Sequence, residues 1–201
     1  MQLRPYQQED VSKLLTRSAM GLFNEQRTGK TPTAIMTMEA RAVERLLIVS
    51  PASMLYKWKE EYEAWTGKHA RVITSATEYL KDMSMAQDLL TDALIVNYEN
   101  LRDNGKRKGV WDAILRKYKP TGMIVDEAHR CKSRTTANTK AIAKCSWKIP
   151  NRLYLTGTPA PNKPWDVWTL LHMIDKEQFS SYWQFVDDYF EKRPIFLGTT
   201  I

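Results

Sequence analysis

The sequence has few of the residues from which metal clusters and disulfide frameworks are built. It contains only two cysteines and three histidines in 201 residues. Cys131 and Cys145 lie 14 residues apart without a neighbouring Cys or His pair, and the histidines are scattered along the chain. This spacing argues against a zinc site and indicates free thiols in a reducing compartment.

Long hydrophobic runs are missing as well. No apolar stretch reaches the roughly 18 residues that a membrane-spanning helix needs, and residues 1–5 lack the apolar region of a secretory signal. We therefore expect an intracellular protein with no membrane partner. Hydrophobic residues still make up 43% of the chain, which is enough to bury the core of one α/β domain.

The composition has an excess of positively charged residues. Lys and Arg number 30 against 23 Asp and Glu, which gives a net charge of +7. An excess of this sign favours polyanionic partners such as nucleic acid. Charge alone does not separate a nucleic-acid-binding protein from other basic proteins.

Five short apolar runs recur along the chain, and a polar residue follows each of them. Apolar runs that are too short for helices are typical of strands buried on both faces of a parallel sheet. Because ligands bind at the carboxyl ends of such strands, we expect the polar residues to line the working edge of the sheet. The runs are Met20–Phe23 before Asn24, Leu46–Val49 before Ser50, Ala93–Val96 before Asn97, Met123–Val125 before Asp126, and Leu153–Leu155 before Thr156.

The segments between these runs have helical patterns. Apolar residues repeat at intervals of three and four from Leu55 through Trp58 and Tyr62 to Trp65, and a second stripe runs from Ile35 to Ala42. Such alternation predicts an α/β fold, a doubly wound and mainly parallel sheet flanked by helices. Further helices are expected at 77–90, 136–145, 165–174 and 182–190, and loops at 103–109 and 158–164. The tryptophans of the last two helices are interpreted as core residues rather than as a base-stacking surface; they are Trp165, Trp168 and Trp183.

The segment Asn24–Thr31 stands between a predicted strand and a predicted helix and contains Gly29-Lys30-Thr31. A phosphate-binding loop needs a glycine where the backbone approaches a phosphate, a lysine for the β- and γ-phosphates, and a hydroxyl for Mg²⁺. The helix N-terminus adds its dipole to the site. The tripeptide by itself is equally compatible with an ordinary helix N-terminus.

A second segment strengthens the nucleotide interpretation. Met123–Val125 is an apolar strand that ends in Asp126 and Glu127. Two adjacent acids at a buried strand end are costly unless a cation or a reaction uses them. We expect Asp126 to hold Mg²⁺ and Glu127 to orient the attacking water in phosphoryl transfer. The alternative is a helix N-cap with acids in the first turn.

Several segments resemble the motifs of one family, in the family's order and over nearly the whole chain. Asp126-Glu127-Ala128-His129 resembles a DEAH box, and Leu155–Pro159 with Asn162 resembles the third helicase motif in its Swi/Snf-type form. The sequence is thus similar to the N-terminal RecA-like lobe of Swi/Snf-type superfamily 2 DNA translocases. The other matching segments are Leu3–Gln7, similar to the adenine-reading segment; Ser50–Ser53 with Trp58, Glu61 and Trp65, similar to motif Ia; and Val96–Leu101, similar to motif Ib.

This resemblance implies a role for each matching residue. ATP contacts would come from Arg4, Gln7, Gln26, Arg27, Thr28, Gly29, Lys30 and Thr31, with Thr31 and Asp126 on Mg²⁺ and with Lys30, Asp126 and Glu127 as the catalytic groups. Coupling of nucleotide state to the nucleic-acid track would use His129, Thr156, Gly157 and Thr158. Ser53, Lys57, Asn97 and Tyr98 would lie near a DNA backbone, although Lys57 and Lys59 are equally compatible with the solvated face of a helix.

Two departures from the family pattern bear on the functional expectation. Asn24 and Arg27 stand at positions of the phosphate loop that are usually small. No segment after Ile174 resembles the second RecA-like lobe, whose arginines complete such a site and are worth about 10³–10⁵ in rate in related enzymes. We expect a lobe at 1–175 and a helical extension at 176–201 toward a second lobe, supplied in cis or in trans.

The expected function is a nucleic-acid-dependent ATPase of the duplex-DNA-translocating kind, only weakly active as one lobe, with ATP and Mg²⁺ as its ligands. Two alternatives from other classes remain open at this point. One is a single-lobe nucleotide-binding regulatory module without turnover of its own. The other is a basic DNA-binding scaffold whose nucleotide site is vestigial.

Overall fold

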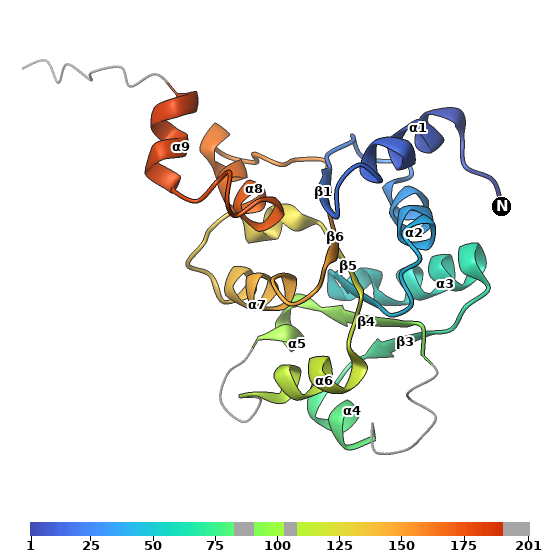
Figure 1. The fold of residues 1–201 in the computed structure, drawn as a ribbon. Coiled ribbons are helices and arrows are strands. Elements are labelled where there is room, and N and C mark those ends of the chain that lie inside the picture. The colour runs from blue at the N-terminus through green and yellow to red at the C-terminus, as the bar shows by residue number, and fades with distance from the viewer. Residues whose placement is uncertain (83–90, 103–107, 191–201) are drawn as a thin grey trace, which may run out of the picture.

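Six parallel strands form the central sheet of the computed structural model, which describes residues 1–82, 91–102 and 108–190 (Figure 1). The order across the sheet is β1-β6-β5-β2-β4-β3, and all five neighbouring pairs are parallel. The predicted α/β fold class, with a mainly parallel sheet flanked by helices, is confirmed. The strands are β1 (Ala19–Leu22), β2 (Leu46–Ser50), β3 (Ala70–Ile73), β4 (Ala93–Asn97), β5 (Gly122–Asp126) and β6 (Asn151–Leu155).

Helices cover both faces of this sheet, which is why the interior strands are apolar along their whole length. In β2 all five residues are buried, and Val49 pairs with Val96 of β4 on one side and Val125 of β5 on the other. Each face has its own hydrophobic core. On one face lie α1 (Pro5–Leu14), α2 (Lys30–Ala40) and α3 (Leu55–Thr66); on the other lie α4 (Ala76–Asp82), α5 (Tyr98–Leu101), α6 (Val110–Tyr118), α7 (Ala137–Ser146) and α8 (Trp168–Ile174) (Figure 1).

Shorter elements complete the described chain. Single 3₁₀ turns precede α3, follow β5 and precede α8, and α9 lies beyond α8 on the outside of the molecule (Figure 1). The part of the chain that the structure describes contains no helix long and apolar enough to cross a membrane. The three 3₁₀ turns named above are η1 (Ala52–Met54), η4 (Ala128–Cys131) and η5 (Pro164–Val167), and the outer helix α9 is Tyr182–Tyr189.

Some elements differ from the sequence-based prediction. The strand β3 was not predicted, because it lies at the edge of the sheet and its two central residues are only partly buried, so it lacks a continuous apolar run. The helices α1, α5 and α6 were not predicted either. The strand β1 begins one residue earlier than expected, and the second stripe is wrong at Ala42, which follows the end of α2 with φ of 53°. Of the expected helix 77–90, α4 covers the first part and 83–90 lie outside the described residues, as do 103–107 of the expected loop.

The three tryptophans that were expected in the core differ in burial. Trp168 is 6% exposed and fits the prediction, whereas Trp165 and Trp183 are 37% and 66% exposed and contradict it. Trp183 is exposed because it lies on α9, in which only Phe185 is buried, and Trp165 is exposed because it lies in η5, in which no residue is buried.

The strand order brings the segments with chemical motifs together. All six strands are parallel, so their carboxyl ends lie along the same edge of the sheet. The strand β6 lies between β1 and β5 and therefore places Thr156 between the loop after β1 and the acids after β5. The five predicted strands are consecutive in the sheet and parallel, so the polar residues at their carboxyl ends lie along one edge, as expected.

Candidate functional site

The loop between β1 and α2 depends on a glycine conformation. Gly29 is the N-cap of α2 with φ of 75°, and Arg27 has φ of 64°. A Cβ atom at Gly29 would lie 2.3 Å from Nε2 of Gln7, so the position needs glycine both for its backbone and for its space. The loop then leads directly into the first turn of α2, where backbone N–H groups have no partner within the helix.

Two residues of α1 support this loop through hydrogen bonds to its backbone. The side chain of Gln7 is buried; its Nε2 donates to the carbonyls of Thr28 (3.4 Å) and Gly29 (3.2 Å), and its Oε1 accepts from the backbone N–H of Arg4 (2.8 Å). Tyr6 donates from its hydroxyl to the Thr28 carbonyl at 3.0 Å. Both ends of the Gln7 amide are therefore engaged with backbone, and its contact with adenine remains a prediction.

Lys30 reaches back across the loop. Its Nζ donates to the carbonyl of Asn24 at 2.9 Å and to that of Glu25 at 2.7 Å. The Asn24 side chain is directed out of the loop, because its Nδ2 donates to Asp10 Oδ2 at 2.6 Å. Asparagine at this normally small position therefore does not block the loop.

Asp126 at the end of β5 is held by three donors from different elements. Its Oδ2 accepts from Trp58 Nε1 at 2.9 Å, its Oδ1 accepts from the Glu127 N–H at 2.9 Å, and its carbonyl accepts from the hydroxyl of Tyr98. Burial raises the pKa of the Asp126 carboxyl, and the Trp58 hydrogen bond partly offsets this effect. Trp58 and Tyr98 are 1% and 0% exposed, so Trp58 fixes the carboxylate and Tyr98 fixes the backbone of Asp126.

The roles of Trp58 and Tyr98 were missed in the sequence. Trp58 was assigned to an apolar stripe and to the segment similar to motif Ia, without a polar partner. A buried indole N–H normally finds such a partner, and that rule could have pointed to an acid nearby. Tyr98 was expected near a DNA backbone. The structure contradicts this expectation for the Tyr98 side chain, which is completely buried and therefore not accessible to a nucleic acid.

The other residues expected near nucleic acid lie at or close to the surface. Asn97 caps α5 by accepting from the Asn100 N–H at 2.8 Å. Ser53 in η1 and Lys57 on α3 are exposed, and Lys57 also lines the cleft described below. Lys59 is paired with Glu63 at 3.8 Å along the same helix.

Glu127 lies beside a histidine that also faces the segment after β6. Glu127 has a left-handed backbone with φ of 51°, and its Oε2 lies 3.2 Å from His129 Nδ1. The same nitrogen lies 3.1 Å from Thr156 Oγ1 and 3.4 Å from Thr158 Oγ1. One imidazole nitrogen therefore connects the acid pair with both threonines.

The segment after β6 also touches the loop after β1. A Cβ atom at Gly157 would lie 3.1 Å from Cγ and 3.3 Å from the backbone nitrogen of Gln26. Thr156 donates its backbone N–H to the Leu22 carbonyl at 3.2 Å. This segment therefore contacts both the loop after β1 and His129.

A cleft of about 430 Å³ opens between these segments, within the size range of small-molecule sites. Thr31 and Asp126 contribute hydroxyl and carboxylate oxygens, the ligands that Mg²⁺ prefers, while Lys30 supplies positive charge for phosphates. Burial raises the pKa of Glu61 at its wall, and the nearby Lys57 opposes this. The lining thus fits Mg²⁺ with a phosphorylated ligand; it consists of Gln26, Arg27, Gly29, Lys30, Thr31, Pro32, Met54, Lys57, Glu61, Asp126 and Glu127.

Known proteins with similar sequences share nearly the whole length of this chain. It is 30% identical over 203 residues to the ISWI chromatin-remodeling complex ATPase ISW1 of Saccharomyces cerevisiae, covering 94% of this chain and 17% of the relative. It is 29% identical over 207 residues to the protein CHROMATIN REMODELING 5 of Arabidopsis thaliana, covering 93% and 11%. The chain therefore spans less than a fifth of the length of these relatives.

Solved structures agree on the fold. The Sulfolobus solfataricus SWI2/SNF2 ATPase core in complex with dsDNA superimposes with a TM-score of 0.74 at 22% identity, over 93% of this chain and 38% of that one. The SNF2-related domain family matches residues 6–195. On this match, the chain belongs to the SNF2-related domain family.

Proposed function

We propose that this chain is the Mg-ATP-binding lobe of a nucleic-acid-dependent ATPase, a DEAH-box variant of the Swi/Snf type that acts on duplex DNA. The observation that carries the proposal is the strand order β1-β6-β5, which gathers Lys30, Asp126 and Glu127 at one cleft with Thr156 between them. The names of the relatives, an ATPase of a chromatin-remodeling complex among them, support ATP as the substrate. The similar ATPase core is in complex with dsDNA, which supports duplex DNA as the partner.

In this proposal the loop after β1 binds the phosphates. Backbone N–H groups of the loop and of the first turn of α2 donate to them, and Lys30 exchanges the carbonyls of Asn24 and Glu25 for the β- and γ-phosphates. The exchange is favourable because a charge-assisted bond to phosphate replaces bonds to neutral carbonyls. Arg27 lies at the wall of the cleft, where its guanidinium can reach an anionic ligand.

Thr31 and Asp126 would hold Mg²⁺, whose charge neutralises the phosphates during transfer. The hydrogen bonds from Trp58 and from the Glu127 N–H orient the Asp126 carboxylate for this purpose and favour its ionised form, against the opposite effect of burial on its pKa. Glu127 accepts the proton of the attacking water as general base. Positioning and electrostatics supply most of the catalysis in this class of reaction.

The coupling to nucleic acid would run through His129. Its Nδ1 carries either one proton or one lone pair, so it cannot bond fully to Glu127, Thr156 and Thr158 at once. A change of partner would therefore link the acid pair to the segment Thr156–Thr158. Ser53, Lys57 and Asn97 are the proposed contacts to a DNA backbone, since Ser53 and Lys57 lie on the segment that follows β2 and Asn97 lies at the end of β4.

A second RecA-like lobe, in cis or in trans, would complete the site with arginines. The helix α9 would belong to the extension toward that lobe, while 191–201 of the expected extension lie outside the described residues. The complete protein would work inside the cell, where its DNA lies. One lobe alone is then expected to bind ATP but to hydrolyse it slowly.

Calorimetric titration of residues 1–201 with Mg²⁺ and a non-hydrolysable ATP analogue tests the binding site. We expect binding that Lys30→Ala weakens by about 100-fold, because a charge-assisted interaction with two phosphates is lost. Lys117→Ala on α6, an exposed lysine outside the cleft, is the matched control and should bind like the unmodified chain. Equal binding by the Lys30→Ala variant would contradict the assignment.

The rate of ATP hydrolysis distinguishes the proposed ATPase from a nucleotide-binding regulatory module. A longer chain with a second lobe is expected to hydrolyse ATP faster when duplex DNA is added, while residues 1–201 alone stay slow. Absence of any DNA stimulation in the longer chain would favour a nucleotide-binding module without turnover. Fast, DNA-stimulated hydrolysis by residues 1–201 alone would show that the second lobe is not needed.

A further inference from the structure

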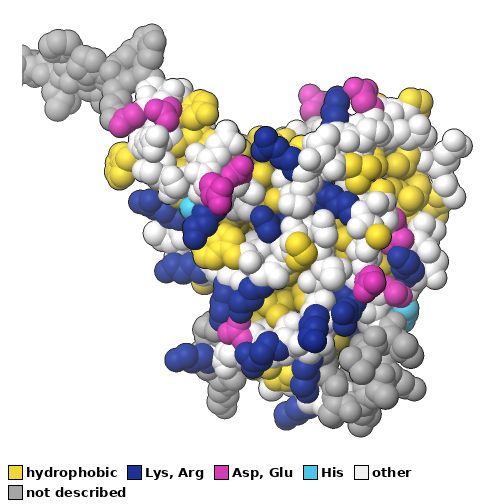
Figure 2. Space-filling model, in the orientation of Figure 1, with side chains coloured by type: hydrophobic (Ala, Val, Ile, Leu, Met, Phe, Trp, Pro, Cys, Tyr) yellow, Lys and Arg dark blue, Asp and Glu magenta, His cyan; other side chains and the backbone are white. Residues whose placement is uncertain are grey.

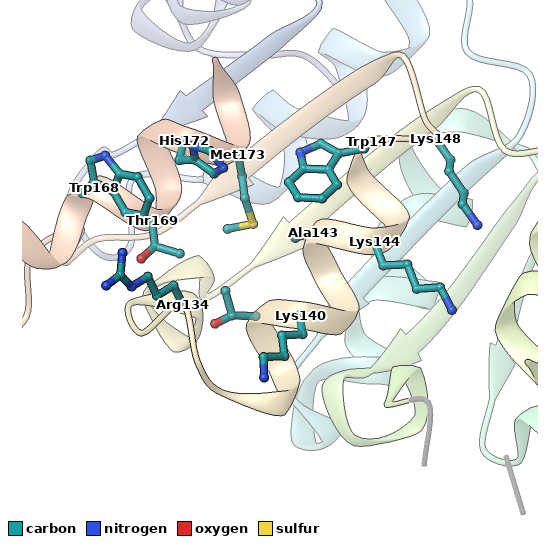
Figure 3. Close-up of a pocket in the computed structure, with 11 residues that line it drawn as sticks. Arg134, Lys140, Ala143, Lys144, Trp147, Lys148, Trp168, Thr169, His172 and Met173 are labelled. Atoms are coloured by element: carbon teal, nitrogen blue, oxygen red, sulfur yellow. The ribbon is translucent and has the colours of Figure 1, made fainter. Parts of the chain in front are cut away.

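A second cavity, separate from the nucleotide cleft, lies between α7 and α8. Its volume is about 460 Å³. Ala143 and Trp147 face it from α7 and its end, and Trp168, Thr169 and Met173 face it from α8 (Figure 3). None of these residues lines the cleft that contains Lys30 and Asp126. We call this cavity the α7–α8 groove.

The walls of the α7–α8 groove are apolar and fixed. Trp168 stacks on His172 with ring centroids 4.8 Å apart, and Trp147 meets the edge of the same imidazole at 6.3 Å. His172 Nδ1 is in turn 2.7 Å from the Phe179 carbonyl, which holds the ring in place. Trp147 nevertheless remains 52% exposed at the mouth of the groove. A large aromatic side chain that is exposed beside an apolar cavity is typical of a binding surface.

Basic side chains surround this apolar surface. Lys140, Lys144 and Lys148 follow one another at intervals of four residues, and all three line the groove. Lys176 lies over the Trp147 ring with Nζ 4.7 Å from its centroid. Arg134 lines the opposite side of the groove (Figure 3).

One carboxylate is engaged with this rim. Asp112 of α6 lies 2.6 Å from Lys144 and 2.6 Å from Lys148, so the rim keeps a clear positive excess. In the space-filling view, hydrophobic surface between α7 and α8 is bordered by dark blue Lys and Arg side chains (Figure 2). An apolar floor with a cationic border is complementary to a ligand with an apolar centre and a negative border.

We propose that the α7–α8 groove docks an acidic peptide segment of a partner protein. A leucine or aromatic side chain of the segment fills the cavity against Trp147, Trp168 and Met173, and its flanking carboxylates pair with Arg134 and the lysines of the rim. This is the arrangement of an amphipathic segment in a hydrophobic groove. The groove needs no nucleotide, so the proposal does not depend on the proposed function.

The ring geometry favours a peptide over a nucleic acid. A single-stranded nucleic acid binds by stacking bases on open aromatic faces along a basic track. In the groove, His172 stacks against Trp168, and Lys176 covers a face of Trp147. A concave apolar cavity instead suits an aliphatic or aromatic side chain, which gains by leaving water.

Fluorescence anisotropy with residues 1–201 tests this docking. The probe is a short fluorescein-labelled peptide with Leu and Phe on one helical face and Glu on the other. Two control peptides replace Leu and Phe by Ala, or Glu by Lys. We expect the first control to bind about 10- to 100-fold more weakly, as for the loss of a buried anchor, and the second not to bind measurably.

Two variants identify the groove as the site. Trp147→Ala should weaken binding of the acidic peptide by about tenfold at any salt concentration, because it removes apolar contact. Lys140→Glu should weaken it about three- to tenfold at low salt and less at high salt, because it reverses one rim charge. Lys117→Glu on α6, an exposed lysine outside the groove, should leave it unchanged. Trp147 and Lys140 are exposed, so both variants should keep the melting temperature and the binding of the ATP analogue at the cleft.

Three outcomes would overturn the proposal. The acidic peptide binds no more tightly than its alanine control, or Trp147→Ala and Lys140→Glu leave its affinity unchanged. Alternatively, a labelled single-stranded oligonucleotide binds and loses affinity in both variants while the acidic peptide does not bind, which would assign the surface to nucleic acid.

Discussion

Two of the cavities in the described part of the chain have similar volumes and opposite character. The proposed nucleotide cleft, of about 430 Å³, lies where strands end, and its wall contains Lys30, Asp126 and Glu127. The α7–α8 groove, of about 460 Å³, lies between two helices, and aromatic and aliphatic side chains form its wall. Polar groups thus line the cleft itself, whereas in the α7–α8 groove they lie around an apolar wall.

This difference follows from how each cavity is built. At the carboxyl edge of a parallel sheet, the chain leaves its strands in loops, so backbone N–H groups and short polar side chains are available for a ligand. Between two helices the backbone groups are already bonded within each helix, and only side chains remain for contact. We therefore expect substitutions at the cleft to act on chemistry, and substitutions at the groove to act on affinity for a partner.

The largest expected effect is on turnover at the cleft. Glu127→Gln keeps the shape of the side chain but removes the base, so hydrolysis should fall by about 10²- to 10⁴-fold while the ATP analogue still binds. Single-turnover hydrolysis, in the longer chain with a second lobe, measures the first quantity and calorimetry the second. Glu177→Gln, an exposed glutamate after α8, is the control. Retained turnover in the Glu127→Gln variant would assign the base to another residue.

The next effect concerns the backbone of the phosphate loop. Gly29→Ala should lower stability by about 2–4 kcal/mol, because alanine is strained at φ of 75° and its Cβ displaces Gln7 from the loop carbonyls. Gly67→Ala is a matched control: Gly67 has φ of 68°, but a Cβ there would meet no atom within 4 Å, so strain acts without displacement. We expect Gly67→Ala to cost only about 1–2 kcal/mol. Equal losses in thermal unfolding would mean that Gln7 does not support the loop.

How much the sequence could reveal differs between the two cavities. The cleft is built from local motifs, so Gly29, Lys30 and Asp126 could be assigned from their neighbours in the chain and from the apolar runs before them. Contacts between distant segments were not predictable in this way: the pairing of Trp58 with Asp126 joins residues far apart in the chain. Tyr98 was misassigned for the same reason, because burial is decided by tertiary packing.

No motif in the sequence predicted the α7–α8 groove. Its walls come from two helices that are joined through β6, and the apolar residues at 165–174 and 182–190 indicated only helices with a buried face. Whether a tryptophan of such a helix is covered depends on what packs against it. The helix α9 leaves Trp183 exposed, whereas Trp168 is buried. The strand β3 was missed on similar grounds, since an edge strand has no continuous apolar run.

A smaller effect tests how the cleft is connected to the core. Trp58→Phe keeps an aromatic side chain but replaces the indole by a smaller ring without the N–H, which leaves the Asp126 carboxylate with one donor fewer at a buried position. We expect a loss of about 1.5–3 kcal/mol in the free energy of unfolding and a weaker dependence of analogue binding on Mg²⁺. Trp65→Phe on the same helix, outside the cleft lining, should leave the Mg²⁺ dependence as it is. If the two variants behave alike, the indole hydrogen bond does not orient Asp126.

The smallest effect lies at the rim of the groove and separates stability from affinity. The hydrogen bonds from Lys144 and Lys148 lower the pKa of Asp112 to about 2. A carboxylate with a lowered pKa stabilises the fold above its unfolded pKa, near 4, and this contribution fades as the pH falls toward 2. Asp112→Asn should therefore cost up to about 1 kcal/mol at neutral pH, where surface pairs are screened, and almost nothing at pH 2.

The same substitution should act in the opposite direction on the acidic peptide. Removing the Asp112 charge makes the rim more positive, so the peptide should bind more tightly although the fold is less stable. Glu9→Gln on α1, whose partner Lys13 lies far from the groove lining, removes an exposed charge pair and should leave peptide affinity unchanged. A loss of both stability and affinity in Asp112→Asn would mean that Asp112 positions Lys144 and Lys148 for the ligand. A gain in affinity would instead show that Asp112 competes with the ligand for these lysines, as expected if the rim selects its partner by charge.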